Sequence, residues 1–447
     1  MPQLVEPKNV RPILKKHILA DGYEMVLDLQ KSKGPYLHDS ATGKDYLDFF
    51  TFYASNPLGM NHDRLAGDPE FIQTIGQAAV NKPSNSDVYT EEMAHFVDTF
   101  ARVGIPEYMP YTFFVSGGAL AVENALKVAF DWKVQKNFQK GYRTEKGHKV
   151  LHLDKAFHGR SGYTMSLTNT DPKKVKYFPK FDWPRIHNPA VRFPLTEENI
   201  NKVAMEEKEA LAQARRYFEM YEDDIACIIL EPIQGEGGDN HFRKEFHTGL
   251  RDLADEFDAL LIHDEVQTGI GLTGKFWAHE HYVKPDILAF GKKAQVCGIL
   301  ASKRIDDIET NCFHVSSRIN STWGGNLVDM VRFDRILEVI EEENLVQNAA
   351  RTGEYLLNAI RKMAETEEHL SNPRGKGLFC AIDLPDTHAR NAVIKECAKN
   401  GLMILGCGTK TVRFRPPLTV KKEHIDEAID LLTKSYKAAL QECPVAS

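Results

Sequence analysis

The sequence contains no apolar stretch that approaches the roughly 18 residues of a membrane-spanning helix, and its first 17 residues have no apolar core like that of a signal peptide. It also lacks any run of lysine and arginine, and its formal net charge is −7. This charge pattern does not predict a nucleic-acid-binding surface. We therefore expect a soluble, cytoplasmic protein that binds neither nucleic acid nor membrane.

Cysteines are few, and none belongs to a C-x-x-C pair. The seven are Cys227, Cys297, Cys312, Cys380, Cys397, Cys407 and Cys443. Their odd number and their positions in apolar runs favour buried free thiols in a reducing compartment over disulfides. We expect no metal site.

The middle of the chain predicts an α/β domain. With 447 residues, 42% of them hydrophobic and 27% charged, the chain can build a large globular domain and a smaller one. Short apolar runs alternate there with amphipathic segments, which is typical of a mostly parallel sheet flanked by helices. The expected strands are Tyr111–Val115, Lys149–Leu153, Ala226–Leu230, Ala259–His263 and Asp286–Phe290. Ligands bind at the carboxyl ends of such strands.

The two ends of the chain follow other patterns. Residues 23–53 contain two alternating strands around a Thr-Gly turn, residues 330–364 have a helical period, and a final helix is expected over residues 422–441. We expect an N-terminal segment (1–65), a large domain (66–329) and a C-terminal part (330–447). The two termini would build one small α+β domain together.

A strand-to-helix junction in residues 113–132 has the composition of a phosphate site. An apolar run ends at Ser116, Gly117-Gly118 predict a tight turn, and an alanine-rich helix follows. The free N–H groups and positive end of a helix attract anions, and glycine lets a phosphate approach the backbone. An ordinary strand-to-helix turn is the alternative.

Two further strand ends carry carboxylates. The segment 230–238 runs from an apolar strand into Glu231, Glu236 and three glycines, so it predicts either the rim of a site or a structural loop. Asp264 follows a strand that should be buried on both faces, and the N–H of a protonated pyridine ring would be a good partner for it. A helix cap or a structural ion pair is the alternative, and His263 is expected to be a core histidine.

Residues 269–274 match G-x-G-x-x-G, but the match does not predict a nucleotide site. The dinucleotide motif needs a glycine turn directly after its strand, whereas the expected strand ends five residues earlier at Asp264. A P-loop would need serine or threonine after Lys275, where Phe276 stands.

Lys292 lies at the end of the apolar run that precedes Gly291. Lysine is rarely buried without a reason, and a desolvated amine has a lowered pKa and can attack a carbonyl to form a Schiff base. A solvated charge at the sheet edge is the alternative. The order of phosphate turn, buried carboxylate and recessed lysine, each at a strand end, favours the chemical interpretation.

This ordered set resembles the class III aminotransferases, which belong to the fold type I pyridoxal-phosphate enzymes. The resemblance spans nearly the whole chain and is most specific in the D-E-V-Q-T-G block that starts at Asp264, with Lys292 of a Gly-Lys pair 28 residues after it. Within the family, the subgroup that acts on the terminal amine of L-lysine is the most similar. The stretches that carry this are residues 81–89, 156–170, 178–186, 290–298 and 318–326.

The resemblance implies a role for each residue that matches the family pattern. Lys292 would bind pyridoxal 5'-phosphate covalently, and Asp264 would pair with the ring nitrogen and keep the ring an electron sink. Gln267 would hydrogen-bond the ring hydroxyl, and Phe157 would stack on the ring face. For the phosphate, the expected contacts are the backbone N–H groups of Gly118 and Ala119 and, from the neighbouring subunit, Thr322. A homodimer with shared active sites follows from the last contact.

Two stretches depart from the broader family pattern. The family has H-x-S/T-T-F/Y-G-G before the second phosphate contact, whereas this chain has N-S-T-W-G-G at 320–325. The early L-G-H signature is replaced by L-G-M-N at 58–61. Both departures agree with the lysine subgroup and weaken an ornithine or 4-aminobutyrate assignment.

The implied reaction moves the terminal amino group of L-lysine to 2-oxoglutarate, so one pocket must hold two different substrates. Arg160 would bind the distant carboxylate of either substrate, and Arg413 the near carboxylate of 2-oxoglutarate. Glu236 would pair with Arg413 while lysine is bound, because an unpaired buried guanidinium is costly. Arg415 is the competing choice for Arg413, and Asn320 is either a substrate contact or a loop amide.

Three alternatives remain at this level. Another ω-aminotransferase would differ in its amino donor, and a decarboxylase, mutase or racemase could share the same fold and cofactor. The Glu236–Arg413 pair favours transamination, because only a two-substrate cycle needs a switchable carboxylate site. A non-enzymatic member of the family is disfavoured by the presence of Lys292 and Asp264.

Overall fold

A computed structural model describes residues 5–442 of the chain and places a seven-stranded sheet at its centre. The strand order is β4 (Tyr111–Val115), β10 (Cys297–Ala301), β9 (Ile287–Phe290), β8 (Leu260–Asp264), β7 (Ile225–Leu230), β5 (Lys149–Leu153) and β6 (Arg185–Ile186). The pairs from β9 to β6 are parallel, and β10 runs antiparallel to both β9 and β4. The mostly parallel sheet is therefore confirmed.

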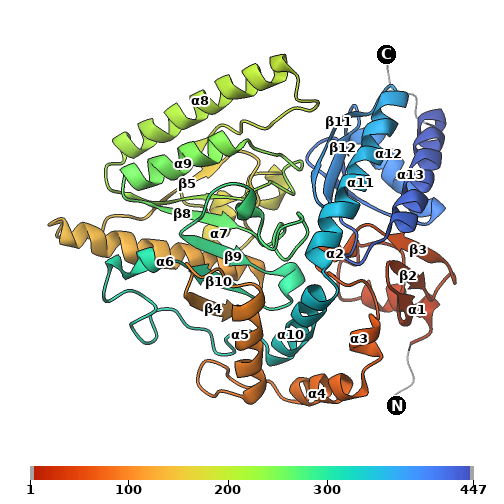
Figure 1. The fold of residues 1–447 in the computed structure, drawn as a ribbon, viewed down its shortest axis with the longest axis horizontal. Helices are drawn as coiled ribbons and strands as arrows, with labels where there is room; N and C mark the ends of the chain where they lie inside the picture. The colour runs from red at the N-terminus through yellow and green to blue at the C-terminus, as the bar shows by residue number, and fades with distance from the viewer. Residues whose placement is uncertain (1–4, 443–447) are drawn as a thin grey trace.

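Helices cover both faces of this sheet, as Figure 1 shows. The helix α6 (Gly118–Gln139) packs on one face, and α8 (Glu197–Met220) and α9 (Lys244–Glu256) lie on the other. Strand β7 has the sequence IACIIL, and all six residues are buried. Such continuously apolar strands need cover on both sides, which explains the three-layer arrangement. Beside the sheet, α5 (Glu91–Val103) and α4 (Pro69–Val80) pack against α10 (Leu327–Glu342).

All five predicted strands are present. Two have the predicted bounds. Strand β7 begins one residue earlier, at Ile225, β9 begins one residue later, at Ile287, and β8 is shifted by one residue at both ends, to Leu260–Asp264. Strand β10 is absent from the predicted strands; its short apolar run CGILA follows the turn after Lys292. Strand β10 runs antiparallel to β9 and no α-helix separates the two. The predicted alternation of strands and helices therefore does not include it.

The second part of the molecule has two four-stranded sheets. The first has the order β1 (Leu27–Lys33), β2 (Tyr36–Asp39), β3 (Asp45–Asp48) and β13 (Leu402–Met403), and the second β11 (Ser371–Lys376), β12 (Phe379–Asp383), β15 (Thr411–Phe414) and β14 (Leu405–Cys407). Because β13 pairs with β3, the two ends of the chain build one sheet. Figure 1 shows the red N-terminal strands beside the blue C-terminal helices. Borders at residues 65 and 329 stay a prediction.

The helical stretch after residue 326 is divided. The predicted helical period runs through α10 and α11 (Leu345–Thr366), which are separated at Asn344 with φ at +54°. Asparagine tolerates this left-handed conformation better than most residues, so the chain can turn there without glycine. Helices α12 (Thr387–Asn400) and α13 (Lys422–Glu442) follow, the latter close to its predicted bounds.

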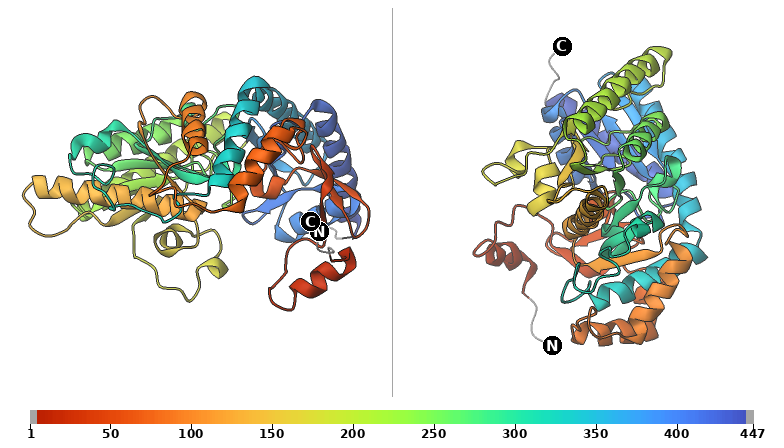
Figure 2. Two further views of the ribbon diagram at one scale, coloured as in Figure 1. Left: turned by 90° about the horizontal axis from the view of Figure 1, so that it is seen from below. Right: turned by 90° about the vertical axis from the view of Figure 1, so that its left-hand side faces the viewer.

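The short helix α1 (Pro7–Leu14) has no buried residue and stands off from the body of the molecule in both views of Figure 2. Within residues 5–442, no helix is long and apolar enough to cross a membrane. Six of the seven cysteines are buried free thiols, as expected, and Cys443 lies outside the described residues.

Candidate active site

One edge of the central sheet gathers the chemically active residues. Strands β4, β5, β7, β8 and β9 point in the same direction, so their carboxyl ends meet at this edge. Ligands bind at this edge of an open α/β sheet. The residues at or just after the five strand ends are Gly117, Phe157, Glu231, Asp264 and Lys292.

Lys292 opens the 3-10 turn η3 (Lys292–Ala294) directly after β9 and lines a cavity of about 550 Å³ together with Ser116, Gly117 and Cys297. Its φ is +52°, a left-handed conformation that costs free energy in a residue other than glycine. Burial, and then the nearby charge of Arg413, lower the pKa of its amine to about 8. About a tenth of the amine is therefore neutral and nucleophilic at pH 7, a few hundred times the share in a lysine with an ordinary pKa.

The neighbouring Lys293 is buried and has different surroundings. Its amine donates to the carbonyl of Gln267 at 2.7 Å and to that of Ala54 at 3.2 Å. Burial, and then the charge of Lys292, hold the pKa of Lys293 well below its usual value. Lys293 thereby connects the loop after β8 to the turn at residue 54.

That turn, α2 (Thr51–Ala54), is left-handed. All four residues have φ between +41° and +64°, and none is a glycine. Left-handed geometry costs roughly 1–2 kcal/mol for each such residue, so the surroundings must hold it in place. The Asp48 carboxylate accepts the N–H groups of Phe50 and Thr51, and Thr51 donates its hydroxyl to the carbonyl of Arg415. As a result Phe52 faces the same cavity as Lys292. No sequence signal marks this turn, and the sequence analysis missed it.

Asp264 ends β8 and is only 5% exposed. One carboxylate oxygen is 2.8 Å from Nδ1 of His158, and the other accepts the backbone N–H of Val266 at 3.1 Å. The Asp264 charge also raises the pKa of Lys292, so the two groups are electrostatic neighbours. His158 is not among the predicted site residues, although it is the neighbour of Phe157 in the chain.

Glu231 is a second buried carboxylate at this edge. It accepts the backbone N–H of Phe157 at 3.0 Å and that of Gly235 at 3.0 Å, and so joins the loop after β5 to the loop after β7. Burial raises its pKa to about 7. Glu231 lies in the segment predicted as either a site rim or a structural loop, but no sequence feature predicts a role for it.

The turn before α6 has the features of a phosphate cradle. Gly117 has φ at +114°, and no side chain caps the first N–H groups of this long helix. A Cβ at Gly118 would lie 2.8 Å from Cγ1 of Val266, so glycine is needed where α6 passes the loop after Asp264. The uncapped N–H groups of Gly118 and Ala119 are available to an anion.

Gln267 lies next to two buried arginines. Its side-chain oxygen accepts from Nη2 of Arg415 at 3.2 Å and from Nη1 of Arg413 at 3.5 Å. A Cβ at Gly235 would approach that oxygen to 2.3 Å, so the loop after β7 packs closely against it. Gln267 therefore lies between the edge of the central sheet and the two arginines at the end of β15.

Glu236 forms two ion pairs at once. Its Oε2 is 2.8 Å from Nη2 of Arg413, and its Oε1 is 2.6 Å from Nζ of Lys174. Burial raises the pKa of Glu236, but Arg413 and Lys174 outweigh this effect and hold it below its usual value. The Glu236–Arg413 pair was expected, whereas Lys174 is one of several lysines in its segment and carries no sequence signal.

Arg415 lies two residues beyond Arg413 and has another set of partners. Its Nη2 donates to both carboxylate oxygens of Asp239 at 2.7 and 2.8 Å, and its guanidinium carbon lies 3.4 Å from the ring centre of Phe379. Arg374 adds donations to the carbonyls of Gly238 and Asp239. These contacts fix the end of the loop that carries Glu236.

The remaining predicted site residues lie at the surface. Arg160 is exposed, and within residues 5–442 it has no ion-pair partner. Asn320 is exposed and its side-chain oxygen accepts the N–H of Ser321 at 2.7 Å. Thr322 is also exposed, and its carbonyl accepts the hydroxyl of Ser84 at 2.6 Å. Within residues 5–442 of this single chain, no hydrogen bond or ion pair joins any of these three to the cluster around Lys292.

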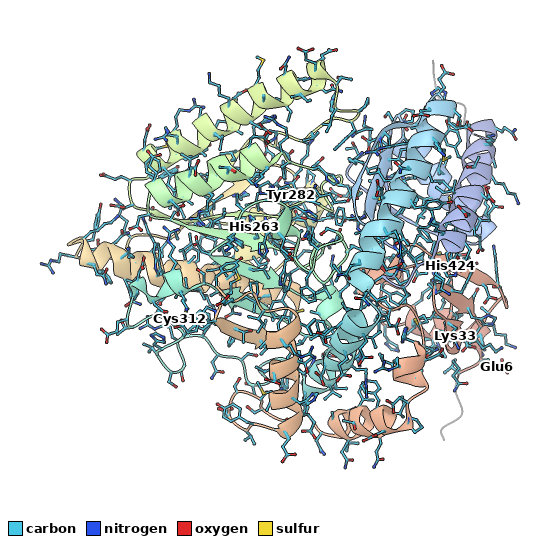
Figure 3. All side chains as sticks on the ribbon, viewed as in Figure 1. Glu6, Lys33, His263, Tyr282, Cys312 and His424 are labelled. Carbon is cyan, nitrogen blue, oxygen red and sulfur yellow. The ribbon has the colours of Figure 1, made fainter. Side chains whose placement is uncertain are left out.

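The histidine beside Asp264 belongs to the core, as expected. His263 is fully buried in β8, and its ring centre lies 5.7 Å from that of His247, which stacks on Tyr282; His263 and Tyr282 are both labelled in Figure 3. Burial holds the pKa of His263 well below its usual value, so it is neutral.

The observed residues fit pyridoxal phosphate. The start of α6, with Gly117 and Gly118 and no capping side chain, suits its phosphate. The buried amine of Lys292, with its lowered pKa, suits its aldehyde. Asp264 is a buried carboxylate beside that amine and suits a protonated ring nitrogen.

Comparison with known proteins agrees with this fit. The family model described as aminotransferase class-III matches residues 18–435. The L-lysine-epsilon aminotransferase of Mycobacterium tuberculosis is 55% identical over 425 residues, which cover 95% of this chain and 94% of that protein. The enzyme of the same name from Amycolatopsis lactamdurans is 52% identical over 434 residues, which cover 96% of each chain. A solved structure of lysine aminotransferase from M. tuberculosis in the internal aldimine form is 54% identical, with a TM-score of 0.95, 97% of this chain and all of that chain covered.

Proposed function

Because the chain belongs to the class III aminotransferases, which are pyridoxal-phosphate enzymes, we propose that it moves the ε-amino group of L-lysine to 2-oxoglutarate. The products are L-glutamate and 2-aminoadipate 6-semialdehyde, and the semialdehyde cyclises to piperideine-6-carboxylate. The similarity to enzymes named for this activity, over nearly the full length of both chains, supports the choice of lysine.

The observation that carries the proposal is the pair between Arg413 and Glu236 beside the recessed amine of Lys292. A buried guanidinium needs an anion at all times, and here the protein supplies one of its own. Such an internal carboxylate is useful in a site that binds two kinds of substrate. In one half of the cycle the substrate has no carboxylate next to the reacting carbon, and Glu236 pairs with Arg413; in the other half a dicarboxylate takes that place.

The bound cofactor supplies an electron sink that stabilises the carbanion at the carbon bearing the amino group. The residues that would hold it are Lys292, Asp264, Gln267, Phe157, Gly118 and Ala119. The amine of Lys292 accepts the proton from the ε-carbon of lysine in the first half-reaction and delivers one to the α-carbon of the keto acid in the second. Its pKa of about 8 suits both directions near neutral pH.

The carboxylate contacts change between the two halves. While lysine is bound, Glu236 pairs with Arg413, and Arg160 binds the α-carboxylate of lysine, with Asn320 near its α-substituents. When 2-oxoglutarate enters, its near carboxylate takes the place of Glu236 on Arg413 in a bidentate contact. Arg160 then binds the distant carboxylate of the keto acid.

We further propose a cytoplasmic homodimer in which Thr322 completes the phosphate site of the neighbouring subunit. Thr322 is exposed on a loop held by Ser84, so its hydroxyl is accessible to a second copy. The helix α1 has no buried residue of its own and would gain cover in such an assembly. Six buried free thiols suit a reducing compartment.

The test is to mix the purified protein with lysine and 2-oxoglutarate and to measure glutamate and the cyclic imine. Ornithine and 4-aminobutyrate serve as competing donors, and absorbance of the cofactor reports the first half-reaction alone. Equal or faster reaction with either competing donor would refute lysine specificity. Loss of carbon dioxide without glutamate would refute transamination.

A further inference from the structure

We propose that Lys174 is a positioning residue for the Glu236 switch: it keeps a cationic partner for Glu236 when 2-oxoglutarate displaces that carboxylate from Arg413. This inference deepens the proposed function and rests on it. Lys174 lies in the 3-10 turn η1 (Pro172–Lys174), far in sequence from both residues that it serves.

The contact geometry supports this role. Glu236 uses a different oxygen for each cation, Oε1 for Lys174 and Oε2 for Arg413, so one ion pair can break while the other remains. The Lys174 side chain is 15% exposed and that of Glu236 is 30% exposed, whereas that of Arg413 is 1% exposed. Glu236 can therefore move from the buried cation toward the more accessible one.

Lys174 is itself held close to the site. Its ammonium group donates to the hydroxyl of Thr170 at 3.2 Å and lies 5.2 Å from the ring centre of Phe157. The turn that carries it is closed by Asp171, whose side chain accepts the N–H of Lys173 at 2.9 Å and whose carbonyl accepts the N–H of Lys174 at 3.0 Å. The charge is thus fixed at the sheet edge and does not belong to a free surface side chain.

The local charge gives the sign of the effect. With Lys174, Arg413 and Glu236 present, the group carries one net positive charge, and the near carboxylate of 2-oxoglutarate neutralises it. Without Lys174, the same carboxylate would leave the group with one net negative charge, because Glu236 would have no cation once Arg413 is taken. Lysine brings no carboxylate to Arg413, so Lys174 affects the two half-reactions unequally.

The test compares Lys174→Met with the control Lys173→Met in the holoenzyme. Lys173 is the adjacent residue, is exposed, and within the described chain has no ion-pair partner. We expect Lys174→Met to raise KM for 2-oxoglutarate about tenfold and to change kcat/KM for lysine less than about threefold. Lys173→Met should leave both unchanged, and Lys174→Arg should restore KM.

Calorimetry with glutarate gives a second readout, because this dicarboxylate has no keto group and cannot react. Its affinity should fall about tenfold in Lys174→Met. In a Glu236→Gln background, Lys174→Met should cause a much smaller loss, since the carboxylate that Lys174 serves is gone.

Three results would overturn the inference: an unchanged KM for 2-oxoglutarate in Lys174→Met, equal damage to both half-reactions, or the same tenfold loss of glutarate affinity in the Glu236→Gln background. A failure of the proposed function would be visible earlier and separately, because the unmodified protein would then not react with lysine and 2-oxoglutarate.

Discussion

The two sides of the site hold their charged groups in different ways. On the sheet side, Asp264 is 5% exposed and is fixed by His158 and by a backbone N–H. On the opposite side, Glu236 divides its oxygens between Arg413 and Lys174, and its side chain is 30% exposed. A group that acts on every turnover can be locked in place, whereas a carboxylate that must leave for one substrate needs partners that can be exchanged.

Arg413 and Arg415 repeat this contrast on a single strand end. Both are buried. Arg415 donates to both carboxylate oxygens of Asp239 and stacks on Phe379, whereas Arg413 donates to only one carboxylate oxygen of Glu236. The structure thus gives a physical reason for choosing between two arginines that sequence spacing does not separate.

The largest expected effect comes from Lys292→Ala, on the sheet side of the site. Loss of the amine removes both the covalent attachment and the proton carrier, so transamination should fall by about 10⁴-fold or more. Steady-state assays measure the rate, and borohydride reduction followed by mass spectrometry measures the attachment. Cofactor still fixed to the variant after reduction would mean that another lysine holds it.

Arg413→Met should damage only one half of the cycle. The half-reaction with 2-oxoglutarate should slow by about 10²–10³-fold in kcat/KM, since a buried charge-assisted pair with the carboxylate is lost. The half-reaction with lysine should change less than about threefold. Stopped-flow measurement of each half-reaction separates the two, and equal losses would contradict the exchange of partners.

Arg415→Met should destabilise the protein but should not change the two half-reactions unequally. It leaves Asp239 buried without its cation, which should lower the free energy of unfolding by about 3–5 kcal/mol. Urea unfolding measures the loss, and the double variant Arg415→Met with Asp239→Asn should recover part of it. A loss below about 1 kcal/mol would show that the pair between Arg415 and Asp239 does not lock this loop.

The smallest effect is a pH dependence. The pKa of Lys292 is lowered to about 8, so its neutral fraction rises about tenfold per pH unit below that value and levels off above it. The rate at which the apoprotein binds pyridoxal phosphate covalently should follow the same curve. A rate that continues to rise toward pH 10 would indicate an amine with an ordinary pKa.

Much of the sheet side could be predicted from the sequence. Apolar runs locate the strands, and the carboxyl ends of parallel strands meet, so the sequence alone predicts that Gly118, Asp264 and Lys292 lie close together. Their roles toward the cofactor and the substrates remain predictions.

The opposite side could be predicted only in part. Lys174 is one lysine among several in a polar segment, and only the folded loop brings it to Glu236. The left-handed turn at residues 51–54 contains no glycine, and it is held by Asp48 and Thr51 through contacts that appear only after folding. Tertiary contacts outweigh local preference at such places.

The different surroundings of Lys292, which lines the cavity, and Lys293, which does not, have a consequence for labelling chemistry. Lys293 is enclosed and already donates to two carbonyl oxygens, so an aldehyde or an activated ester has no access to its nitrogen. A reagent small enough to enter the cavity should therefore modify one member of this adjacent pair and leave the other untouched. The selectivity comes from the surroundings of the two side chains, because two chemically identical amines follow each other in the chain.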